Sequence, residues 1–339
     1  MSQALLAIDV GGSTSRVFLV DREGNCLGRG RGTGGNPASN NPEQAAGAII
    51  AAAEQAVAAA GGAFDIELAL IALAGPPVHV ARAKLETAFR ALGLSGPIEF
   101  SSDLLAMFAS VTPTLDGYCV VAGTGSGAVR IRDGRIERAV DAAGWLLGDL
   151  GSGYWLGHEA AKAAAAELDG RGEATALTDA VLGQLGIERT PDMARNSRPA
   201  PLSALMDAVY ALRPIELARF APLVFANRGD AVASRLIATA EQYLATDFAT
   251  AFLDDLPGPI ALGGGVIAQF TGLSAAIGAV VRAAGGVPDI HLVTDGAVGA
   301  SVLALRAARI AVDDKRFAAI KASVAGAADA PHRGGSASV

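Results

Sequence analysis

The hydrophobic pattern opens with an apolar run at residues 5–10, which breaks at two glycines and resumes at residues 17–20. Two β-strands joined by a tight turn produce such a pattern, because glycine accommodates the bend of the backbone. A polar turn at residues 21–25 and a third short apolar stretch at residues 26–30 follow. The pattern therefore predicts a three-stranded meander at the start of the chain.

The same pattern returns in the middle of the chain. Residues 118–131 again give a strand, a turn rich in glycine and hydroxyl side chains, and a second strand. Asp133-Gly134 is a strong hairpin signal and leads to another short strand at residues 136–140. Residues 5–30 and 118–140 are thus predicted to be two copies of one meander. Such a duplication predicts two similar domains that face each other across a cleft.

Helices and strands alternate through the rest of the first half, which is typical of an α/β domain. The expected elements after the first meander are a helix over 42–60, a strand over 68–74, a helix over 80–92, a strand over 98–100 and a helix over 104–110. Beyond residue 153 the periodicity is mainly helical, with late strands at 259–262 and 290–293.

These elements predict two domains and a tail. We expect an N-terminal α/β domain over 1–112 and a C-terminal domain with helical insertions over 113–312. The last core helix, 296–310, is expected to pack back on the N-terminal domain. The pattern weakens from Asp313, so residues 313–339 are expected to be weakly ordered.

Composition narrows the function classes. At 339 residues, with 51% hydrophobic residues, the chain exceeds one ordinary core. No apolar run is long enough to cross a membrane, and no leader pattern precedes the first strand, so we expect a cytoplasmic protein. A net charge of −7 argues against nucleic-acid binding. The two cysteines, Cys26 and Cys119, and four scattered histidines predict free thiols and no zinc site.

Three glycine-rich turns, at residues 11–14, 123–127 and 263–265, each follow a strand. None has the lysine of a P-loop or the spacing of a dinucleotide fingerprint. Turns of this kind suit a nucleotide held between two domains, with the first two on the phosphates and the third near the adenosine. Asp9, at the end of its strand, suits a magnesium ion held through water. A plain hairpin turn is the alternative for residues 9–14.

Phosphoryl transfer also requires a base on the acceptor hydroxyl. Asp103 lies between a strand and a helix and is our candidate for that base, with helix capping as the alternative. Asp149 and Asn36 lie in loops and are either ligands of a sugar or turn residues. Trp145 either stacks on a sugar face or packs internally.

Taken in order, six motifs resemble those of the N-acetylglucosamine kinase and BadF-type ATPase branch of the sugar-kinase, actin and heat-shock chaperone superfamily. The motifs are Asp9–Thr14, Gly35–Pro37, Ser102–Asp103, Ala122–Ser126, Gly148–Trp155 and Leu262–Gly265. The resemblance implies two ribonuclease-H-like (actin-like ATPase) domains with a central cleft, and a homodimer. It also implies ATP and Mg²⁺ as cofactors and a small-molecule amino sugar as substrate, with neither nucleic acid nor membrane as partner.

The resemblance also implies roles for individual residues. Asp9 would manage magnesium, and Asp103 would be the catalytic base. The residues implied at the nucleotide and its phosphates are Gly11, Gly12, Ser13, Thr14, Thr124, Gly125, Gly264 and Gly265. The residues implied at the sugar are Asn36, Asp103, Gly144, Trp145 and Asp149.

The chain departs from the family pattern before Gly148-Asp149. Relatives typically carry Gly-Gly-Trp-Gly there, whereas this chain has the stretch 141–145, Asp-Ala-Ala-Gly-Trp, which places Ala143 at the tryptophan position. The pocket around the 2-substituent of the sugar is therefore expected to differ. Free glucosamine carries an ammonium group, with which Asp149 or Asp141 could pair.

The chain most resembles actinobacterial glucosamine kinases, and this resemblance makes an ATP-dependent kinase of the 6-hydroxyl of glucosamine the leading hypothesis. N-acetylglucosamine is the alternative substrate. A BadF-type activator ATPase would bridge an iron–sulfur cluster through cysteines, but Cys26 and Cys119 fall in predicted strands. A sugar-sensing regulator is a third possibility. No helix-turn-helix pattern precedes residue 5, which disfavours it.

Overall fold

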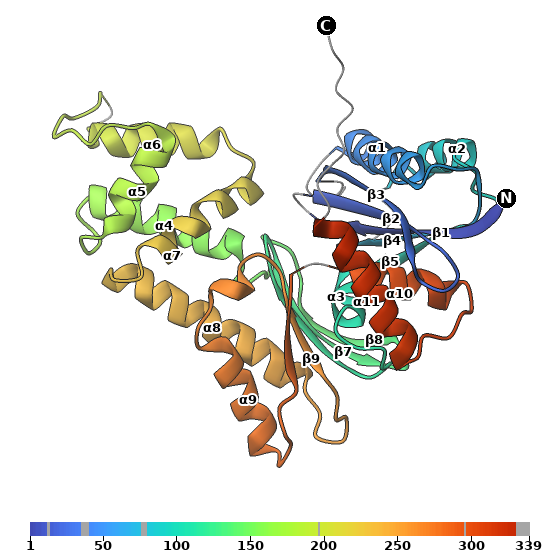
Figure 1. The fold of residues 1–339 in the computed structure, drawn as a ribbon. Helices are drawn as coiled ribbons and strands as arrows, with labels where there is room; N and C mark the ends of the chain where they lie inside the picture. Colours follow the sequence, from blue (N-terminus) through green and yellow to red (C-terminus); the bar gives the residue numbers. More distant parts are fainter. Residues whose placement is uncertain (12–13, 35–40, 76–79, 196, 295, 330–339) are drawn as a thin grey trace, which may run out of the picture. The chain divides into compact units, whose positions relative to one another are not determined.

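The computed structural model describes residues 1–11, 14–34, 41–75, 80–195, 197–294 and 296–329. The chain forms two compact units: unit 1 contains Met1–Leu115 and Asp295–Val339, and unit 2 contains Asp116–Thr294. Each unit is built on one five-stranded sheet with helices (Figure 1), so the predicted α/β class with two domains is confirmed. Unit 2 ends at Thr294, earlier than the expected boundary at 312. The cleft that we expect between the units stays a prediction.

The sheet of unit 1 has the strand order β3-β2-β1-β4-β5. Its strands are β1 (Ser2–Val10), β2 (Thr14–Val20), β3 (Cys26–Thr33), β4 (Phe64–Leu73) and β5 (Ile98–Ser102). The first three form the antiparallel meander, and β4 and β5 continue the sheet in parallel beside β1. In the register, Asp9 lies opposite Ala72, which lies opposite Ser101. Asp9 and the start of the helix after β5 therefore lie at the same edge of the sheet.

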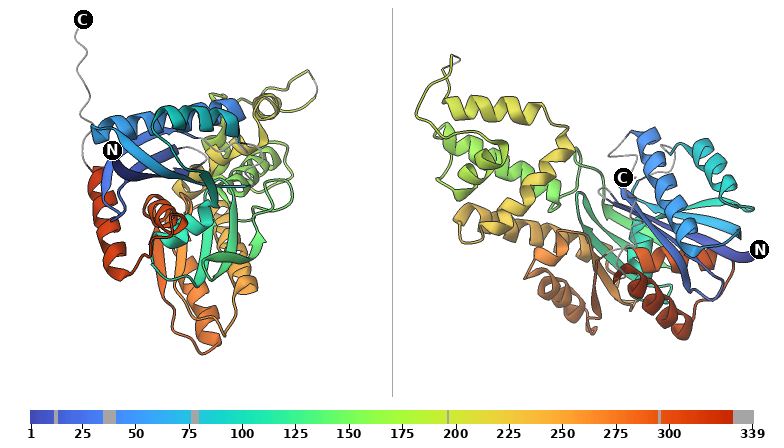
Figure 2. Two further views of the ribbon diagram at one scale, coloured as in Figure 1. Left: turned by 90° about the vertical axis from the view of Figure 1, so that its right-hand side faces the viewer. Right: turned by 45° about the horizontal axis from the view of Figure 1, so that its top comes forward.

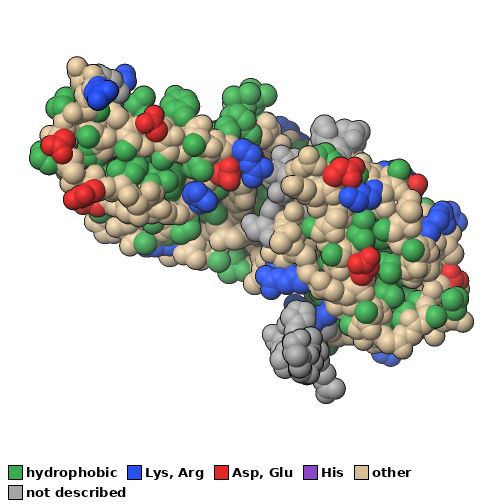
Figure 3. All heavy atoms as spheres, turned by 90° about the horizontal axis from the view of Figure 1, so that it is seen from above, with side chains coloured by type: hydrophobic (Ala, Val, Ile, Leu, Met, Phe, Trp, Pro, Cys, Tyr) green, Lys and Arg blue, Asp and Glu red, His purple; other side chains and the backbone are tan. Residues whose placement is uncertain are grey.

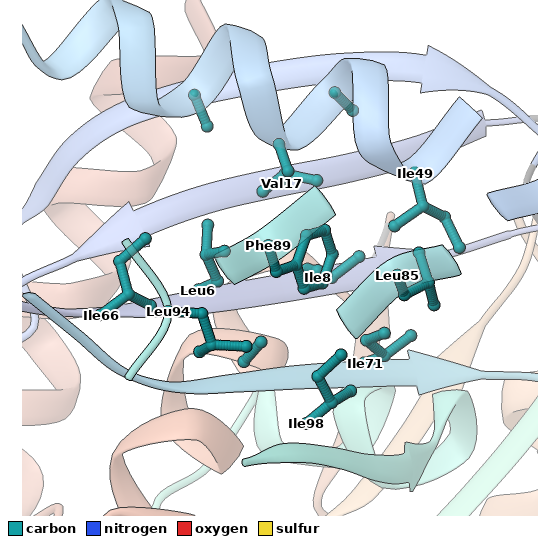
Figure 4. Close-up of a cluster of buried hydrophobic side chains, with 14 of the residues drawn as sticks. Leu6, Ile8, Val17, Ile49, Ile66, Ile71, Leu85, Phe89, Leu94 and Ile98 are labelled. Atoms are coloured by element: carbon teal, nitrogen blue, oxygen red, sulfur yellow. The ribbon is translucent and has the colours of Figure 1, made fainter. Parts of the chain in front are cut away.

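Helices cover both faces of this sheet. They are α1 (Pro42–Ala60), α2 (Arg82–Ala91), α3 (Asp103–Ala109), α10 (Ala297–Ala307) and α11 (Asp314–Asp329). Leu6, Ile8 and Val17 point toward α1 and α2 and meet Phe89 there (Figure 4). The alternate residues Leu5, Ala7 and Phe18 pack with residues of α10 and α11, which lie on the other side of the sheet in both views of Figure 2. Because successive side chains of a strand point to opposite faces of the sheet, the apolar strands of unit 1 contribute to two cores.

Local signals set the bounds of α1 as expected. Asn41 accepts a hydrogen bond from the backbone N–H of Glu43, Pro42 takes the first helical position, and Gly61 ends the helix at a φ of 68°. Each of these residues suits its position for a local reason, so the bounds could be predicted without tertiary information.

The expectation of a weakly ordered tail from residue 313 is wrong for Asp314–Asp329, which form α11. Phe317, Ile320 and Val324 are buried against α10 and the sheet. Their spacing of three and four residues is that of one helix face. The stripe is easy to miss because alanine and polar residues separate its three large members. Residues 330–339 lie outside the described residues.

The sheet of unit 2 has the order β10-β9-β6-β7-β8. Its strands are β6 (Gly117–Ala122), β7 (Ser126–Arg132), β8 (Arg135–Asp141), β9 (Ile260–Gly263) and β10 (Ile290–Val293). Strands β6 to β8 form an antiparallel meander, and β9 pairs in parallel with β6. This arrangement repeats that of β1 to β4 in unit 1, so the two meanders read from the sequence are structural repeats.

Unit 2 has two apolar cores. Around Phe248 and Leu262, the sheet packs with α8 (Ala231–Ala251) and α9 (Leu273–Ala283). A helical cluster surrounds Phe220. It consists of α4 (Gly153–Leu168), α5 (Ala176–Leu185), α6 (Ala200–Tyr210), α7 (Ala221–Ala226) and the 3₁₀ helix η2 (Pro214–Phe220). A second 3₁₀ helix, η3, spans Ile267–Gln269.

On the face drawn in Figure 3, Lys and Arg side chains are scattered among acidic and apolar ones. Within the described ranges, no helix is both long and apolar enough to span a membrane.

Candidate active site

Asp9 is a buried carboxylate near the end of β1. Its side chain is 7% exposed, and its Oδ2 lies 3.3 Å from Nη1 of Arg16, the residue directly opposite on β2. A buried charge is stable only when it is paired or hydrogen-bonded, and the guanidinium provides that pairing. Gly11 donates its backbone N–H to the carbonyl of Thr14 at 2.9 Å, which closes the turn between the strands. Gly12 and Ser13, expected at the phosphates, lie outside the described residues.

The start of α10 packs closely against Asp9. A Cβ on Gly296 would lie 2.7 Å from Oδ1 of Asp9 and 3.2 Å from the Cβ of Ala106 on α3. A Cβ on Gly299 would overlap the carbonyl oxygen of Ala106. The two glycines therefore allow α10 to approach both α3 and the carboxylate, a proximity that the sequence pattern did not reveal.

Asp103 occupies the first residue of α3. Ser102 is the N-cap residue, and its side-chain oxygen accepts the N–H of Leu104 at 3.2 Å, so it shares with Asp103 the capping role that we considered for Asp103. Oδ1 of Asp103 accepts the same N–H at 2.9 Å. Desolvation raises the pKa of the Asp103 carboxyl above its ordinary value, against the opposing effect of the hydrogen bond from Leu104. Asp103 is thus a carboxylate of increased basicity beside the edge that carries Asp9.

In unit 2, two of the glycine-rich turns meet. β6 and β9 are parallel, with Val121 opposite Gly263, so the turns that follow them are neighbours. Val266 donates its N–H to the carbonyl of Ala122 at 2.9 Å, and Gly264 has a φ of 103°. A Cβ on Gly264 would overlap that same carbonyl. Glycine is needed there both for the left-handed backbone and for the close approach.

The turn after β6 also packs on the first residues of α4. The carbonyl of Gly123 accepts the N–H of Gly153 at 2.8 Å, and the carbonyl of Thr124 accepts the N–H of Tyr154 at 3.0 Å. A Cβ on Gly125 would lie 2.9 Å from both carboxylate oxygens of Asp149. Thr124, Gly125, Gly264 and Asp149 are therefore brought together within unit 2.

Asp149 is buried in a loop with a left-handed backbone, at a φ of 55°. Its Oδ1 accepts the N–H of Ser126 at 3.2 Å. Desolvation, and then the charge of Asp141, raise the pKa of the Asp149 carboxyl, while the hydrogen bond from Ser126 opposes them. Asn36, the other loop residue expected at the sugar, lies outside the described residues.

Trp145 lies in the same loop, one residue after Gly144, whose φ is 79°. The indole is 40% exposed and meets the Tyr154 ring edge-on at 5.9 Å, and Tyr154 stacks on His158 at 5.6 Å. An aromatic ring held on one side and open on the other can stack on the apolar face of a pyranose. Desolvation lowers the pKa of His158, although Glu159 opposes the shift, so the neutral imidazole is favoured.

Sequence reasoning missed Asp247 on α8. Its Oδ2 is buried and has no hydrogen-bond partner in the part of the chain that the structure describes. Desolvation, and then the charge of Asp141, raise the pKa of Asp247 to about 7. The sequence carries no signal for this interaction, because only the packing of α8 on β8 brings Asp141 close enough to act on Asp247.

We expect Asp247→Asn to raise the melting temperature at pH 8. Because the carboxyl pKa is 3.8 in the unfolded chain and about 7 in the folded protein, the folded state binds the extra proton, and stability falls as the pH rises between these values. Asparagine removes this loss. Partial solvation limits the gain to about 1 kcal/mol, or roughly 2–4 °C.

Thermal unfolding at pH 5 and pH 8 measures this effect, and the gain should shrink at pH 5. Asp254→Asn, at an exposed carboxylate just after α8, is the matched control and should leave both melting temperatures unchanged. An Asp247→Asn protein with the same pH dependence as the wild type would contradict the assignment.

Comparison with known proteins identifies a family and similar folds. Residues 6–304 match the BadF/BadG/BcrA/BcrD ATPase family. A 112-residue stretch is 36% identical to the N-acetylmuramic acid/N-acetylglucosamine kinase of Clostridium acetobutylicum, which is 32% of this chain and 36% of that relative. The match thus spans about a third of the curated relative.

Among solved structures, the fold is similar to two proteins described as N-acetylglucosamine kinases. The one from Chromobacterium violaceum is 25% identical, with a TM-score of 0.69 over 90% of this chain and 99% of that one. The one from Porphyromonas gingivalis is 20% identical, with a TM-score of 0.65 over 90% and 100%.

Proposed function

The chain belongs to the BadF/BadG/BcrA/BcrD ATPase family, and we propose that it is an ATP-dependent sugar kinase that phosphorylates the 6-hydroxyl of glucosamine. The observation that carries this proposal is Asp103. It is a carboxylate of raised pKa at the strand edge that also holds Asp9, and Ser102 rather than Asp103 occupies the N-cap position of α3. The kinase names of the similar proteins point to the same reaction class.

In the proposed reaction, the 6-hydroxyl oxygen attacks the γ-phosphorus of ATP while its proton passes to the Asp103 carboxylate. The bond between the γ-phosphorus and the bridging oxygen breaks, and ADP leaves with the electron pair. A base must be ionised to accept the proton, and a raised pKa makes the ionised form a better acceptor. Asn36, Gly144, Trp145 and Asp149 are proposed to hold the sugar.

ATP is proposed to bind the glycine-rich turns. Gly11, Gly12, Ser13, Thr14, Thr124 and Gly125 would contact the phosphates, and Gly264 and Gly265 the rest of the nucleotide. The turns at residues 123–127 and 263–265 are neighbours in unit 2. The hydrogen bond between Gly11 and Thr14 supports phosphate binding at the turn in unit 1. Backbone N–H groups in such turns suit phosphate oxygens.

Asp9 fits the proposed magnesium site. Mg²⁺ prefers oxygen ligands and is commonly held by one or two carboxylates together with substrate phosphates. Asp9 offers a buried carboxylate, and the lack of a side chain at Gly296 leaves its Oδ1 uncovered on that side. The ion would neutralise charge on the β- and γ-phosphates when bound. The described residues contain no cluster of three or more acidic, histidine or cysteine ligands. A magnesium site that is completed by substrate phosphates does not need such a cluster.

The choice of glucosamine rests on charge. Residues 141–150 contain two carboxylates, Asp141 and Asp149, and neither lysine nor arginine, so the loop proposed to hold the sugar is acidic. Such a site favours a protonated 2-amino group over a neutral acetamide. N-acetylglucosamine is the second candidate, because the similar proteins carry that name.

A panel of sugars tests the proposal by ADP release in the presence of Mg-ATP. We expect glucosamine to give the highest kcat/KM, followed by N-acetylglucosamine, with glucose and N-acetylmuramic acid lower. A kcat/KM that is highest for N-acetylglucosamine would change the proposed substrate but would leave the proposed kinase activity standing. Failure of every sugar to raise ADP release above background would refute the kinase itself.

The activator-ATPase alternative has little support. Cys26 lies in β3 and Cys119 is buried in β6, whereas a shared cluster needs accessible cysteines. The homodimer and the cytoplasmic location stay predictions.

A further inference from the structure

The loop between β8 and α4 has an unusual backbone. Asp141, Ala142 and Asp149 all have left-handed φ values, of 56°, 54° and 55°. Residues other than glycine rarely adopt this conformation, and surrounding contacts must hold them in it. The loop contains Trp145 and Asp149, both proposed to contact the sugar.

The carboxylate of Asp141 supplies those contacts. Its Oδ1 accepts the backbone N–H of Asp149 at 2.8 Å and that of Ala143 at 3.3 Å. Its Oδ2 accepts the N–H of Leu150 at 2.9 Å. A single side chain thus connects the first residues of the loop to the last, and it binds the backbone of Asp149 directly.

Neighbouring residues are small enough to permit this arrangement. A Cβ on Gly148 would overlap Oδ1 of Asp141, and a Cβ on Gly127 would lie 2.8 Å from the Cβ of Ala142. Gly127 is also the β7 partner of Asp141 in the sheet. Because both oxygens of Asp141 already accept backbone N–H groups, this carboxylate is poorly placed to pair with an ammonium of the substrate, one of the two options we considered.

We propose that Asp141 is a positioning residue, which holds the loop 142–150 so that Asp149 and Trp145 present a preformed surface to the sugar. This inference rests on the proposed function for the identity of the ligand. It assigns Asp141 an effect on sugar affinity rather than on the phosphoryl-transfer step.

Two variants at Asp141 test the proposal. Asp141→Asn keeps one acceptor oxygen, and asparagine tolerates the left-handed backbone. Asp141→Gly removes all acceptors but adopts the same φ without strain. Hydrogen bonds to a charged acceptor are strong, so we expect the glycine variant to raise the KM for glucosamine roughly 10-fold or more, and the asparagine variant to raise it less. The kcat and the KM for ATP should stay within about 3-fold of wild type.

Asp21→Asn is the matched control. Asp21 likewise accepts backbone N–H groups in a turn, from Glu23 and Asn25, but at the other end of β2 from Thr14. Its replacement should leave the KM for glucosamine unchanged. A glucosamine KM equal to wild type in Asp141→Gly, or an equal loss of kcat and rise of both KM values, would overturn the proposal.

Amide hydrogen exchange without any ligand provides a second readout. The N–H groups of Asp149 and Leu150 should exchange at least 10-fold faster in Asp141→Gly than in the wild type, because they lose their acceptor. Unchanged exchange at both amides would refute the positioning role. This readout does not depend on turnover, so it distinguishes failure of the inference from failure of the proposed kinase activity.

Discussion

Asp103→Asn is expected to lower kcat for sugar phosphorylation by roughly 10²–10⁴-fold, the contribution of a positioned general base. The amide matches the carboxylate in shape but cannot accept the proton of the 6-hydroxyl. The fold should survive. Desolvation raises the pKa of Asp103. Ionisation of this carboxylate therefore lowers the free energy of unfolding as the pH rises through that pKa, and a neutral amide avoids this loss at pH 7.

The pH dependence of kcat gives an independent check. The wild-type rate should fall on the acid side below the pKa of Asp103, at a pH higher than an ordinary aspartate would give. The residual rate of Asp103→Asn should lack this limb. Glu99→Gln is the matched control, because Glu99 is an exposed carboxylate on β5, the strand that directly precedes Asp103. Near-normal turnover of Asp103→Asn, with an unaltered acid limb, would remove Asp103 from the role of base.

Gly299→Ala is expected to destabilise unit 1 strongly, although the same change in an open helix position stabilises proteins. The added methyl group would overlap the carbonyl oxygen of Ala106 and approach the backbone N of Ser110 at 2.9 Å. Both are backbone atoms of the α3 region, so no side-chain rotation relieves the overlap and α10 must shift. Overpacking of this kind costs about 1–3 kcal/mol or more, and each kcal/mol lowers the melting temperature by roughly 2–4 °C.

Gly47→Ala provides the control, since Gly47 lies inside α1 with no atom within 4 Å of an added Cβ. Alanine gains roughly 0.5–1 kcal/mol over glycine within a helix, so the melting temperature should hold or rise. A shift of α10 also moves its first residues away from Asp9, so Gly299→Ala should lower kcat/KM as well. Equal melting temperatures for the two alanine variants would contradict the close packing of α10 on α3.

Much of the fold could be predicted because its signals are local. The Asn41-Pro42 start and Gly61 end of α1 need only their own neighbours, and each meander follows from strand alternation and a turn. The failure at α11 has the opposite cause. Phe317, Ile320 and Val324 form a helix face only because α10 and the sheet provide a surface on which to bury it.

In the candidate site, too, local features could be predicted and contacts between distant residues could not. Residue types at strand ends sufficed to nominate Asp9 and Asp103, whereas Asp149, in a loop, was nominated through the family resemblance. Their surroundings could not be predicted, because Gly296 beside Asp9 and Asp247 beside Asp141 are far apart in the chain. The hydrogen bonds of Asp141 to the loop were also not predictable, since they depend on a left-handed backbone at residues that ordinarily avoid it.

The sequence by itself determined the strands, most of the helices, the duplicated meander and the glycine-rich turn at residues 11–14, because hydrophobic period, caps and turn residues act over a few positions. Tertiary structure alone decided that Asp9 faces the start of α10. It also decided that Asp103 is desolvated while Ser102 caps α3. Charge, burial and pKa depend on which distant segments pack together, and that is the information a local pattern lacks.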